Sequence, residues 1–449
     1  MTKAEYEDLT ARAEAIIGAD VQLLADATGA EAGSLVVFNS LSFPRSEVVD
    51  VPFEAAALTD GTSVYPVQKT PDGAVCAIAG IPSKGWKALR PAPAAEAVPT
   101  LSVSKRGIET PFYSIAFNDA GFFTSIFDKE AGRQLLKPGK LGNVLRAYED
   151  KPMNYDNWDI DIYYTEKSWL VEQVESMEWV ETGPVRATLR IRRKFLRSTI
   201  VQNIRFYAGD RRIDFETWVD WKQHQVLLKA EFDVDINANE ATYDIQFGNI
   251  TRPTHANTSW DTAKFEVCAH KWADLSEGSY GVALLNDCKY GYGIREGHMT
   301  LSLIKSGVHP NPVADQEEHT FTYALLPHPG RWQEAAVAEE AYRLNIPVRT
   351  AVASQKGAGL PQSFLTIDGK NSVILETVKQ SEDGKATVLR LYEYKNSRIP
   401  VTISLAEPFA RVEECDLLEN PIAQISMDSG SFSFEIHPYE IKTFRVSRG

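Results

Sequence analysis

Hydrophobic and polar residues alternate with a period of two along most of this chain, from Ser34 to the C-terminal end. This period places successive side chains on opposite faces of a strand, so it predicts a succession of half-buried β-strands. Clear examples are residues 185–196, 199–208, 280–287 and 319–327. The strands are rich in aromatic and β-branched residues and are separated by Gly, Asn and Asp turns. The pattern therefore predicts a mainly β protein built as sandwiches or barrels.

Helical periodicity is confined to two segments. Residues 4–28 repeat Ala, Leu and Ile three and four positions apart, and residues 334–343 predict a short helix. A single helix with one apolar stripe is not stable alone in water, so we expect the first segment to pack against another part of the protein.

The length of 449 residues predicts more than one domain. A Pro/Ala-rich stretch at residues 91–99 is unsuited to a central strand and indicates either a boundary between small β modules or a long strand crossing. We expect four parts, which are a terminal helix (1–30), a small β module (33–100), a large β-sandwich (101–345) and a C-terminal β module (350–449).

Composition and charge exclude several classes of protein. The chain is 43% hydrophobic and 24% charged, with a formal net charge of -14, which argues against nucleic acid as a partner. No apolar run of membrane-spanning length and no signal region occurs, so we expect no membrane partner and a cytoplasmic location. The four cysteines are widely spaced and favour free thiols in a reducing compartment, with Cys268 and Cys288 as the one pair considered for a bridge.

The stretch at residues 149–164, EDKPMNYDNWDIDIYY, combines five carboxylates with four aromatic side chains. Aromatic faces that stack on a sugar ring, beside carboxylates that accept its hydroxyls, are typical of carbohydrate sites. If the segment is extended, Asp159 and Asp161 point to one side and Trp158 to the other. The alternative is a surface loop that leads into a strand.

A second unusual stretch, residues 252–292, is rich in Trp, Tyr, His, Lys and Asp. Its segment AHKWADLSE, residues 269–277, is interpreted as too polar for a core strand and too aromatic for an idle loop. The eight histidines are scattered without metal-ligand spacing, and no nucleophile elbow, phosphate loop or zinc-protease motif occurs. We therefore expect no catalytic residue and no metal ligand from motifs alone.

Three long segments carry a resemblance to a known family. EDKPMNYDNWDIDIYY, NTSWDTAKFEVCAHKWADLSEGSYGVALLNDCKYGY and EHTFTYALLPHPG resemble the C-terminal half of glycoside hydrolase family 38 α-mannosidases, in particular the cytosolic and bacterial branch. The resemblance implies a large antiparallel super-sandwich of the galactose mutarotase-like type, flanked by smaller β-sandwich modules. It also implies that residues 4–28 are the last helix of a helical bundle.

In that family an Asp nucleophile, a carboxylic acid/base and one zinc held by two His and two Asp belong to an N-terminal catalytic domain. This sequence has no segment that matches them, so the resemblance implies zinc in that absent domain and no cofactor, catalytic residue or metal ligand here. The family's β domain completes the sugar pocket with its loops. Matching those loops gives Asp156, Trp158 and Asp159 as substrate-binding residues, with Asp315 and His319 in the loop at residues 306–319 as weaker candidates.

The resemblance implies the C-terminal portion of an α-mannosidase, inactive by itself, that contributes a carbohydrate-facing wall. Its expected partners are a terminal α-mannoside and the catalytic domain. The apolar surface that this domain would cover could otherwise be covered in a homo-oligomer. Two alternatives stay open, which are a stand-alone carbohydrate-binding β-sandwich protein and an enzyme similar to mutarotases, which would need a His and a carboxylate converging on a sheet.

Overall fold

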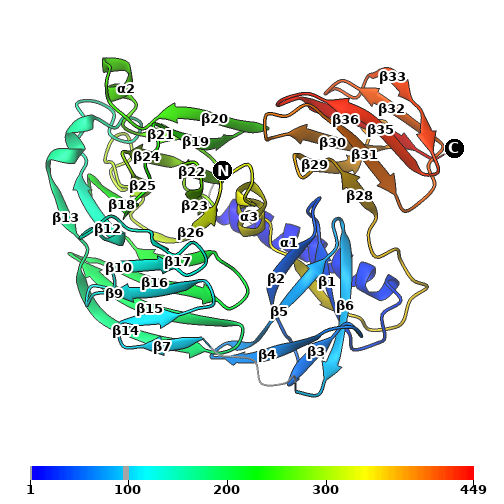
Figure 1. Ribbon diagram of the computed structural model, residues 1–449, viewed down its shortest axis with the longest axis horizontal. Coiled ribbons are helices and arrows are strands. Elements are labelled where there is room, and N and C mark those ends of the chain that lie inside the picture. The colour runs from blue at the N-terminus through cyan, green and yellow to red at the C-terminus, as the bar shows by residue number, and fades with distance from the viewer. Residues whose placement is uncertain (1–2, 95–100, 449) are drawn as a thin grey trace. The chain divides into compact units, whose positions relative to one another are not determined.

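The protein is described by a computed structural model that covers residues 3–94 and 101–448. It consists of two compact units, one formed by Met1–Val98 with Ile346–Gly449 and the other by Pro99–Asn345. All strand pairs of the named sheets are antiparallel, which confirms the predicted mainly β class (Figure 1). Residues 95–99 of the predicted boundary lie outside the described residues.

The first unit contains helix α1 and a seven-stranded sheet. The strand order is β2-β5-β4-β3-β6-β1-β27, and the bounds are β1 Leu35–Asn39, β2 Arg45–Asp50, β3 Ala57–Thr59, β4 Val64–Thr70, β5 Gly73–Ile81, β6 Gly85–Ala92 and β27 Arg349–Val352. Strand β27 pairs with β1 although more than two hundred residues separate them in the sequence. The chain therefore returns to complete the first sheet after it has built the second unit.

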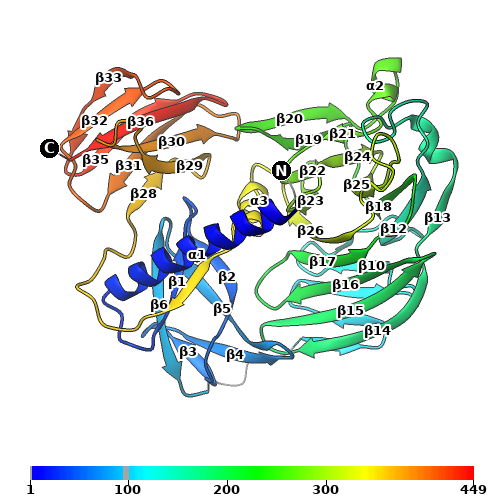
Figure 2. The same cartoon turned by 180° about the vertical axis from the view of Figure 1, so that it is seen from behind.

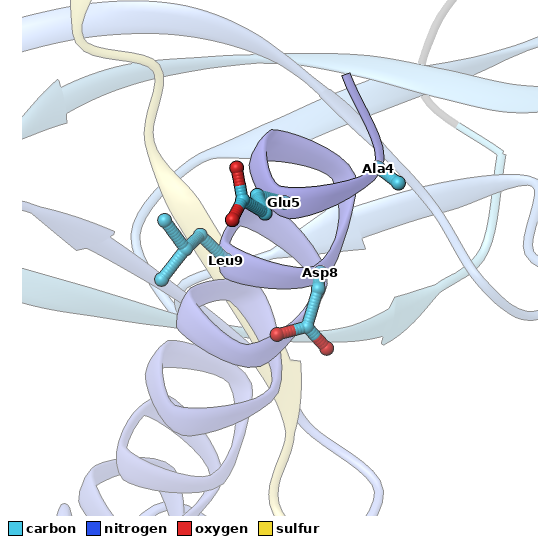
Figure 3. Close-up of a pocket in the computed structure, with 4 residues that line it drawn as sticks. All are labelled: Ala4, Glu5, Asp8 and Leu9. Carbon is cyan, nitrogen blue, oxygen red and sulfur yellow. The ribbon is translucent and has the colours of Figure 1, made fainter. Parts of the chain in front are cut away.

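Helix α1 (Lys3–Ala27) agrees with the predicted segment and lies along β27 (Figure 2). Near its end, Gln22 Nε2 donates a hydrogen bond of 3.0 Å to the Val352 carbonyl, and Asp26 accepts one of 2.7 Å from the Ser354 N–H. Its first turns are exposed, including apolar Leu9, and Figure 3 shows this residue beside Glu5 in a pocket at the start of the helix. The buried part of the helix is thus its C-terminal end, while Glu14 in its middle forms an exposed ion pair with Arg349 at 2.7 Å.

A sandwich of two further sheets completes the first unit. Its four-stranded sheet has the order β28-β31-β35-β34 and its five-stranded sheet the order β29-β30-β36-β32-β33. The bounds are β28 Leu365–Asp368, β29 Val373–Gln380, β30 Thr387–Glu393, β31 Ile399–Leu405, β32 Arg411–Cys415, β33 Pro421–Ile425, β34 Met427–Asp428, β35 Ser431–Ile436 and β36 Ile441–Ser447. Leu391, Val401 and Phe444 lie in its core.

The second unit is the predicted large sandwich of two sheets. The eleven-stranded sheet has the order β21-β24-β25-β18-β12-β10-β9-β8-β7, with β11 beside β10 and β13 beside β12. Its bounds are β7 Ser102–Ser104, β8 Gly107–Glu109, β9 Tyr113–Phe117, β10 Phe123–Asp128, β11 Arg133–Gln134, β12 Gly142–Glu149, β13 Ser168–Leu170, β18 Val226–Asp233, β21 Val267–Cys268, β24 Gly291–Arg295 and β25 His298–Lys305.

The facing sheet has nine strands in the order β14-β15-β16-β17-β26-β23-β22-β19-β20. Its bounds are β14 Gln173–Thr182, β15 Arg186–Phe195, β16 Ser198–Tyr207, β17 Ile213–Asp220, β19 Glu240–Ile245, β20 Gly248–Pro253, β22 Trp272–Ser276, β23 Tyr280–Asn286 and β26 Glu318–Pro329. Three short helices accompany the sheets, namely η1 Ile162–Glu166, α2 Ser259–Ala263 and α3 Val337–Asn345.

Aromatic side chains from the two large sheets meet in one core. Phe215 on β17 stacks on Tyr323 of β26 with ring centroids 4.8 Å apart, and it also packs at 5.8 Å against Phe123 of β10 and Phe232 of β18. All four residues are almost fully buried. This contact between the sheets follows from the strand period, which turns every second side chain inward.

One prediction about this unit is wrong. The segment AHKWADLSE was interpreted as too polar for a core strand, yet Trp272–Ser276 form strand β22 inside the nine-stranded sheet. Ala273 and Leu275 face the core, and the polar residues Asp274 and Ser276 occupy the alternate positions. Asp274 is buried as well, but it is paired with His328, so the polar residues do not prevent a strand.

Candidate functional site

The loop between β12 and β13, residues 150–167, contains the first predicted site. It begins where Asp150 pairs with Lys305 and the Asp150 N–H donates to the Gln225 carbonyl at 2.8 Å. Tyr155 has a left-handed backbone with a φ of 51°, and its carbonyl accepts the N–H groups of both Trp158 and Asp159 at 2.8 and 2.9 Å. These bonds close a turn around Trp158.

The segment at residues 156–166 is not extended, although the loop does lead into strand β13. Residues 156–158 are a turn, and Ile162–Glu166 form the short 3-10 helix η1. Asp161 folds back to accept the Met153 N–H at 2.8 Å. The condition of an extended segment, under which Asp159 and Asp161 would lie opposite Trp158, is therefore not met, because local hydrogen bonds hold the backbone in turns.

Asp156 joins the two predicted loops. Its carboxylate accepts the N–H of Val308 at 2.9 Å, the N–H of His309 at 2.8 Å and the side-chain amide of Gln225 at 3.1 Å. The residue is only 5% exposed. Burial would raise its pKa, but these hydrogen bonds outweigh burial and hold the pKa of Asp156 below its usual value.

Of the other predicted residues, Trp158, Asp159 and Asp315 are exposed, whereas His319 is half-buried at the start of β26. Trp158 is 67% exposed and packs edge-on against Tyr155 at 6.0 Å, and the Tyr155 ring lies 6.2 Å from that of His309. Asp159 is exposed on the same turn. In the second loop, the His319 Nε2 lies 2.8 Å from the Asp315 carbonyl oxygen. The structure thus brings the two loops together at Asp156.

Exposed apolar side chains gather along the first loop. They are Met153, Tyr155, Trp158, Ile162, Tyr163 and, on β13, Trp169 and Leu170. We call this set the aromatic wall. Large exposed apolar groups in one short segment indicate a binding surface rather than ordinary surface composition.

A buried polar cluster behind the aromatic wall was not found from the sequence. Lys229 on β18 pairs with Glu266 and lies 3.2 Å from the Tyr164 hydroxyl, while Glu231 pairs with Arg146 at 2.9 Å. Burial of Lys229 opposes its charge, but Glu266 and Tyr164 raise its pKa. The cluster anchors the loop and the segment around Glu266 on the sheet.

The alternation of apolar and charged residues in β18 could have indicated this cluster from the sequence. Leu228, Ala230 and Phe232 face the core, so Lys229 and Glu231 share the opposite face. Their partner Glu266 comes from a distant segment, which local spacing does not show.

The described residues do not fit a metal site, since no group of three or more His, Cys, Asp or Glu among them is placed to hold an ion. The zinc implied by the resemblance therefore finds no ligand set in this part of the protein. All four cysteines are free thiols, including Cys268 and Cys288. Of the helices in residues 3–94 and 101–448, none has the length and apolar character needed to cross a membrane.

Comparison with protein-family models identifies the two sandwiches. The model described as "Glycosyl hydrolases family 38 C-terminal domain" matches residues 108–313, and the model described as "Glycosyl hydrolases family 38 C-terminal beta sandwich domain" matches residues 372–444. The chain belongs to glycosyl hydrolase family 38. The first match contains the aromatic wall, most of the second loop and the cluster around Lys229.

Curated relatives in this family are identical to the chain at about a third of the aligned positions. Alpha-mannosidase G of Dictyostelium discoideum is 33% identical over 92% of this chain, and alpha-mannosidase 2C1 of Homo sapiens is 31% identical over 97% of it. The chain spans only 40% and 42% of the length of these two relatives. It therefore corresponds to the C-terminal domains of the family.

A solved structure has the same fold. An alpha-mannosidase from Enterococcus faecalis matches 94% of this chain and 57% of its own length with a TM-score of 0.72, at 17% sequence identity. This likeness confirms the predicted large antiparallel super-sandwich with flanking β modules for a family 38 chain.

Proposed function

We propose that this chain is the β-rich portion of an α-mannosidase that hydrolyses terminal α-mannosides. The observation that carries the proposal is the match of nearly the whole chain to proteins named alpha-mannosidase, of which it spans about two fifths. The catalytic groups and the zinc would come from the remaining part of the protein. Because no metal ligand set is found among the described residues, we expect this chain alone not to perform a metal-assisted hydrolysis.

We further propose that the aromatic wall and the loop at residues 306–319 form the carbohydrate-facing wall of that enzyme. The exposed Trp158 offers a ring face to a sugar, and the exposed Asp159 offers hydrogen-bond acceptors. Asp156 has its oxygens occupied by Val308, His309 and Gln225, so it acts as a positioning residue. Asp315 and His319 complete the proposed wall from the second loop.

The proposal includes a catalytic domain that packs on this chain. Tyr6, Leu9, Ile16 and Leu23 of α1 are 47–68% exposed, although apolar residues on one helix are normally covered. A covering domain, or a second copy of the chain, would remove this surface from water. Four free thiols and an acidic composition suit a cytoplasmic location.

The isolated chain is expected to show no turnover of an aryl α-mannoside with added zinc. The native protein that contains this chain is expected to hydrolyse the same substrate and to lose activity when zinc is chelated. Release of the aryl group, followed by absorbance, measures both. Appreciable turnover by the isolated chain, or a native protein that does not cleave α-mannosides, would contradict the proposal.

In the native protein, Trp158→Ala is expected to lower kcat/KM for an α-mannoside by about threefold to tenfold, since an aromatic contact contributes about 0.5–1.5 kcal/mol. Trp260→Ala is the matched control, because Trp260 on α2 is also highly exposed, at 80%. It should leave kcat/KM unchanged. If the two substitutions lower kcat/KM equally, the proposal that the aromatic wall belongs to the substrate site is wrong.

A further inference from the structure

A polar cavity of about 600 Å³ lies in the large sandwich, formed by strands β19, β20 and β22 and by the segment that follows β26. Figure 1 shows these three strands near one another in the nine-stranded sheet, where β19 pairs with both β20 and β22. The volume lies within the range of small-molecule sites, which is about 300–1,000 Å³. Every lining residue belongs to the large sandwich, so this unit contains the whole cavity.

The floor of the cavity is polar because of strand alternation. Ala241 and Leu275 face the core of the sandwich. Thr242 is directly opposite Asp274 on β22 and Thr251 on β20, so hydroxyls and a carboxylate share the outer face. The Trp272–Ser276 strand, which looked too polar from the sequence, thus supplies one side of this floor.

The two carboxylates Asp274 and Glu277 of the cavity are both paired. Asp274 is 1% exposed, and its two oxygens contact the Ser276 hydroxyl and the Nε2 of His328, the latter at 2.7 Å. Glu277 pairs with Arg133 at 2.5 Å and accepts the Asn237 N–H at 3.0 Å. Burial opposes this charge, but these contacts keep the pKa of Glu277 below its usual value. A strongly charged ligand therefore has no unpaired counterpart on this floor.

The rim offers neutral hydrogen-bonding groups. The side-chain amides of Asn237, Asn239 and Gln333 line the cavity, and among the described residues none of them makes a side-chain hydrogen bond. Glu240 and Arg331, also on the rim, are of opposite charge. Each amide both donates and accepts, as each hydroxyl of the floor does.

From this arrangement we propose that the cavity binds a neutral polyhydroxylated ligand, a monosaccharide or a disaccharide. Every sugar hydroxyl is both a donor and an acceptor, which matches the amides of the rim and the threonine hydroxyls of the floor. Trp332 adds apolar surface beside these groups, because it lines the cavity and packs on Trp272 at 5.1 Å. The site requires neither zinc nor a catalytic group and does not rest on the proposed mannosidase activity.

The test is titration of the isolated chain with methyl α-mannoside and with a neutral disaccharide. Binding is measured by calorimetry and by changes in the indole N–H signals of NMR spectra. Both probes should bind saturably and perturb the Trp332 signal. Gln333→Ala and Asn239→Ala should each weaken binding about fivefold to tenfold, since each removes one hydrogen-bonding group. Thr251→Trp should abolish binding by filling the cavity, with the fold checked by circular dichroism.

Gln246→Ala is the matched control, because this exposed glutamine lies in the turn between β19 and β20 and does not line the cavity. It should bind as the unaltered chain does. Three results would overturn the proposal, namely no binding of either probe, binding that survives Thr251→Trp in a folded protein, or displacement of the saccharides by inorganic phosphate. Loss of binding in Trp158→Ala but not in Thr251→Trp would also overturn it and would assign the sugar to the aromatic wall.

Discussion

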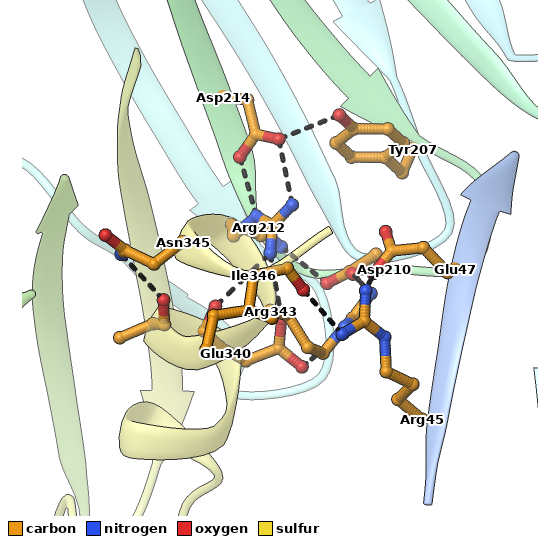
Figure 4. A network of polar contacts seen from close by, with 11 residues as sticks. Arg45, Glu47, Tyr207, Asp210, Arg212, Asp214, Glu340, Arg343, Asn345 and Ile346 are labelled. Atoms are coloured by element: carbon orange, nitrogen blue, oxygen red, sulfur yellow. Dashed lines mark hydrogen bonds and ion pairs between the residues drawn. The ribbon is translucent and has the colours of Figure 1, made fainter. Parts of the chain in front are cut away.

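Asp214→Ala should lower the free energy of unfolding of the large sandwich by about 3–5 kcal/mol, because it removes the nearest partner of the buried Arg212 and leaves only the longer contact to Glu340 at 3.4 Å. Asp214 and Arg212 are 5% and 6% exposed. The Arg212 guanidinium donates to both oxygens of Asp214 at 2.7 and 3.0 Å, and the Tyr207 hydroxyl donates to Asp214 at 2.8 Å (Figure 4). Chemical denaturation of the purified chain measures the loss.

Two variants test whether charge burial is the cause. Tyr207→Phe removes one hydrogen bond to Asp214 and should cost only about 1 kcal/mol. A triple variant, Tyr207→Phe with Arg212→Met and Asp214→Leu, removes both charges and should recover much of the stability lost in Asp214→Ala. If the triple variant is less stable than Asp214→Ala, the pair contributes net stability and the explanation is wrong.

Asp156→Ala is expected to release the loop at residues 306–319 from the aromatic wall. The substitution removes three hydrogen bonds to one carboxylate, and hydrogen bonds to charged groups contribute about 1.5–3 kcal/mol each. Because such contributions do not add fully, we expect local stability to fall by about 2–4 kcal/mol. Amide hydrogen exchange at Val308 and His309 should then be faster by roughly 30- to 1,000-fold.

Asp159→Ala is the control for this prediction, because Asp159 lies on the same turn but is exposed. It should leave exchange at Val308 and His309 unchanged. Asp156→Asn should be intermediate, since the amide oxygen still accepts hydrogen bonds but carries no charge. Unchanged exchange in Asp156→Ala would show that other contacts hold the two loops together.

The pH dependence of this contact follows from the lowered pKa of Asp156 in the folded state. The unfolded carboxyl titrates at about 3.9, so the contribution is fully present above that pH. It is lost as the pH falls through the lower folded value. Exchange protection at Val308 should therefore be insensitive to pH, after correction for intrinsic rates, between about pH 5 and 8.

Local sequence patterns determined the strands and much of the core. The alternating segments 185–196 and 199–208 became β15 and β16, which pair along their length. Inward positions such as Phe215 and Tyr323 follow from the same period, since a strand in a sandwich must bury one face. Long ordered motifs also determined the family, because they extend over many residues.

The partners of the polar residues were decided only by the tertiary structure. Asp156 is a predicted sugar-binding residue, and only the structure shows that its carboxylate accepts the N–H groups of Val308 and His309, more than 150 residues away in the sequence. Strand β27 likewise pairs with β1, from which it is distant in the sequence, to complete the first sheet. Strand period determines which face a side chain occupies, but the course of the chain determines what meets it there. The sequence by itself therefore determined the class, the core and the family, whereas only the tertiary structure decided which carboxylates position loops and where the polar faces line an open cavity.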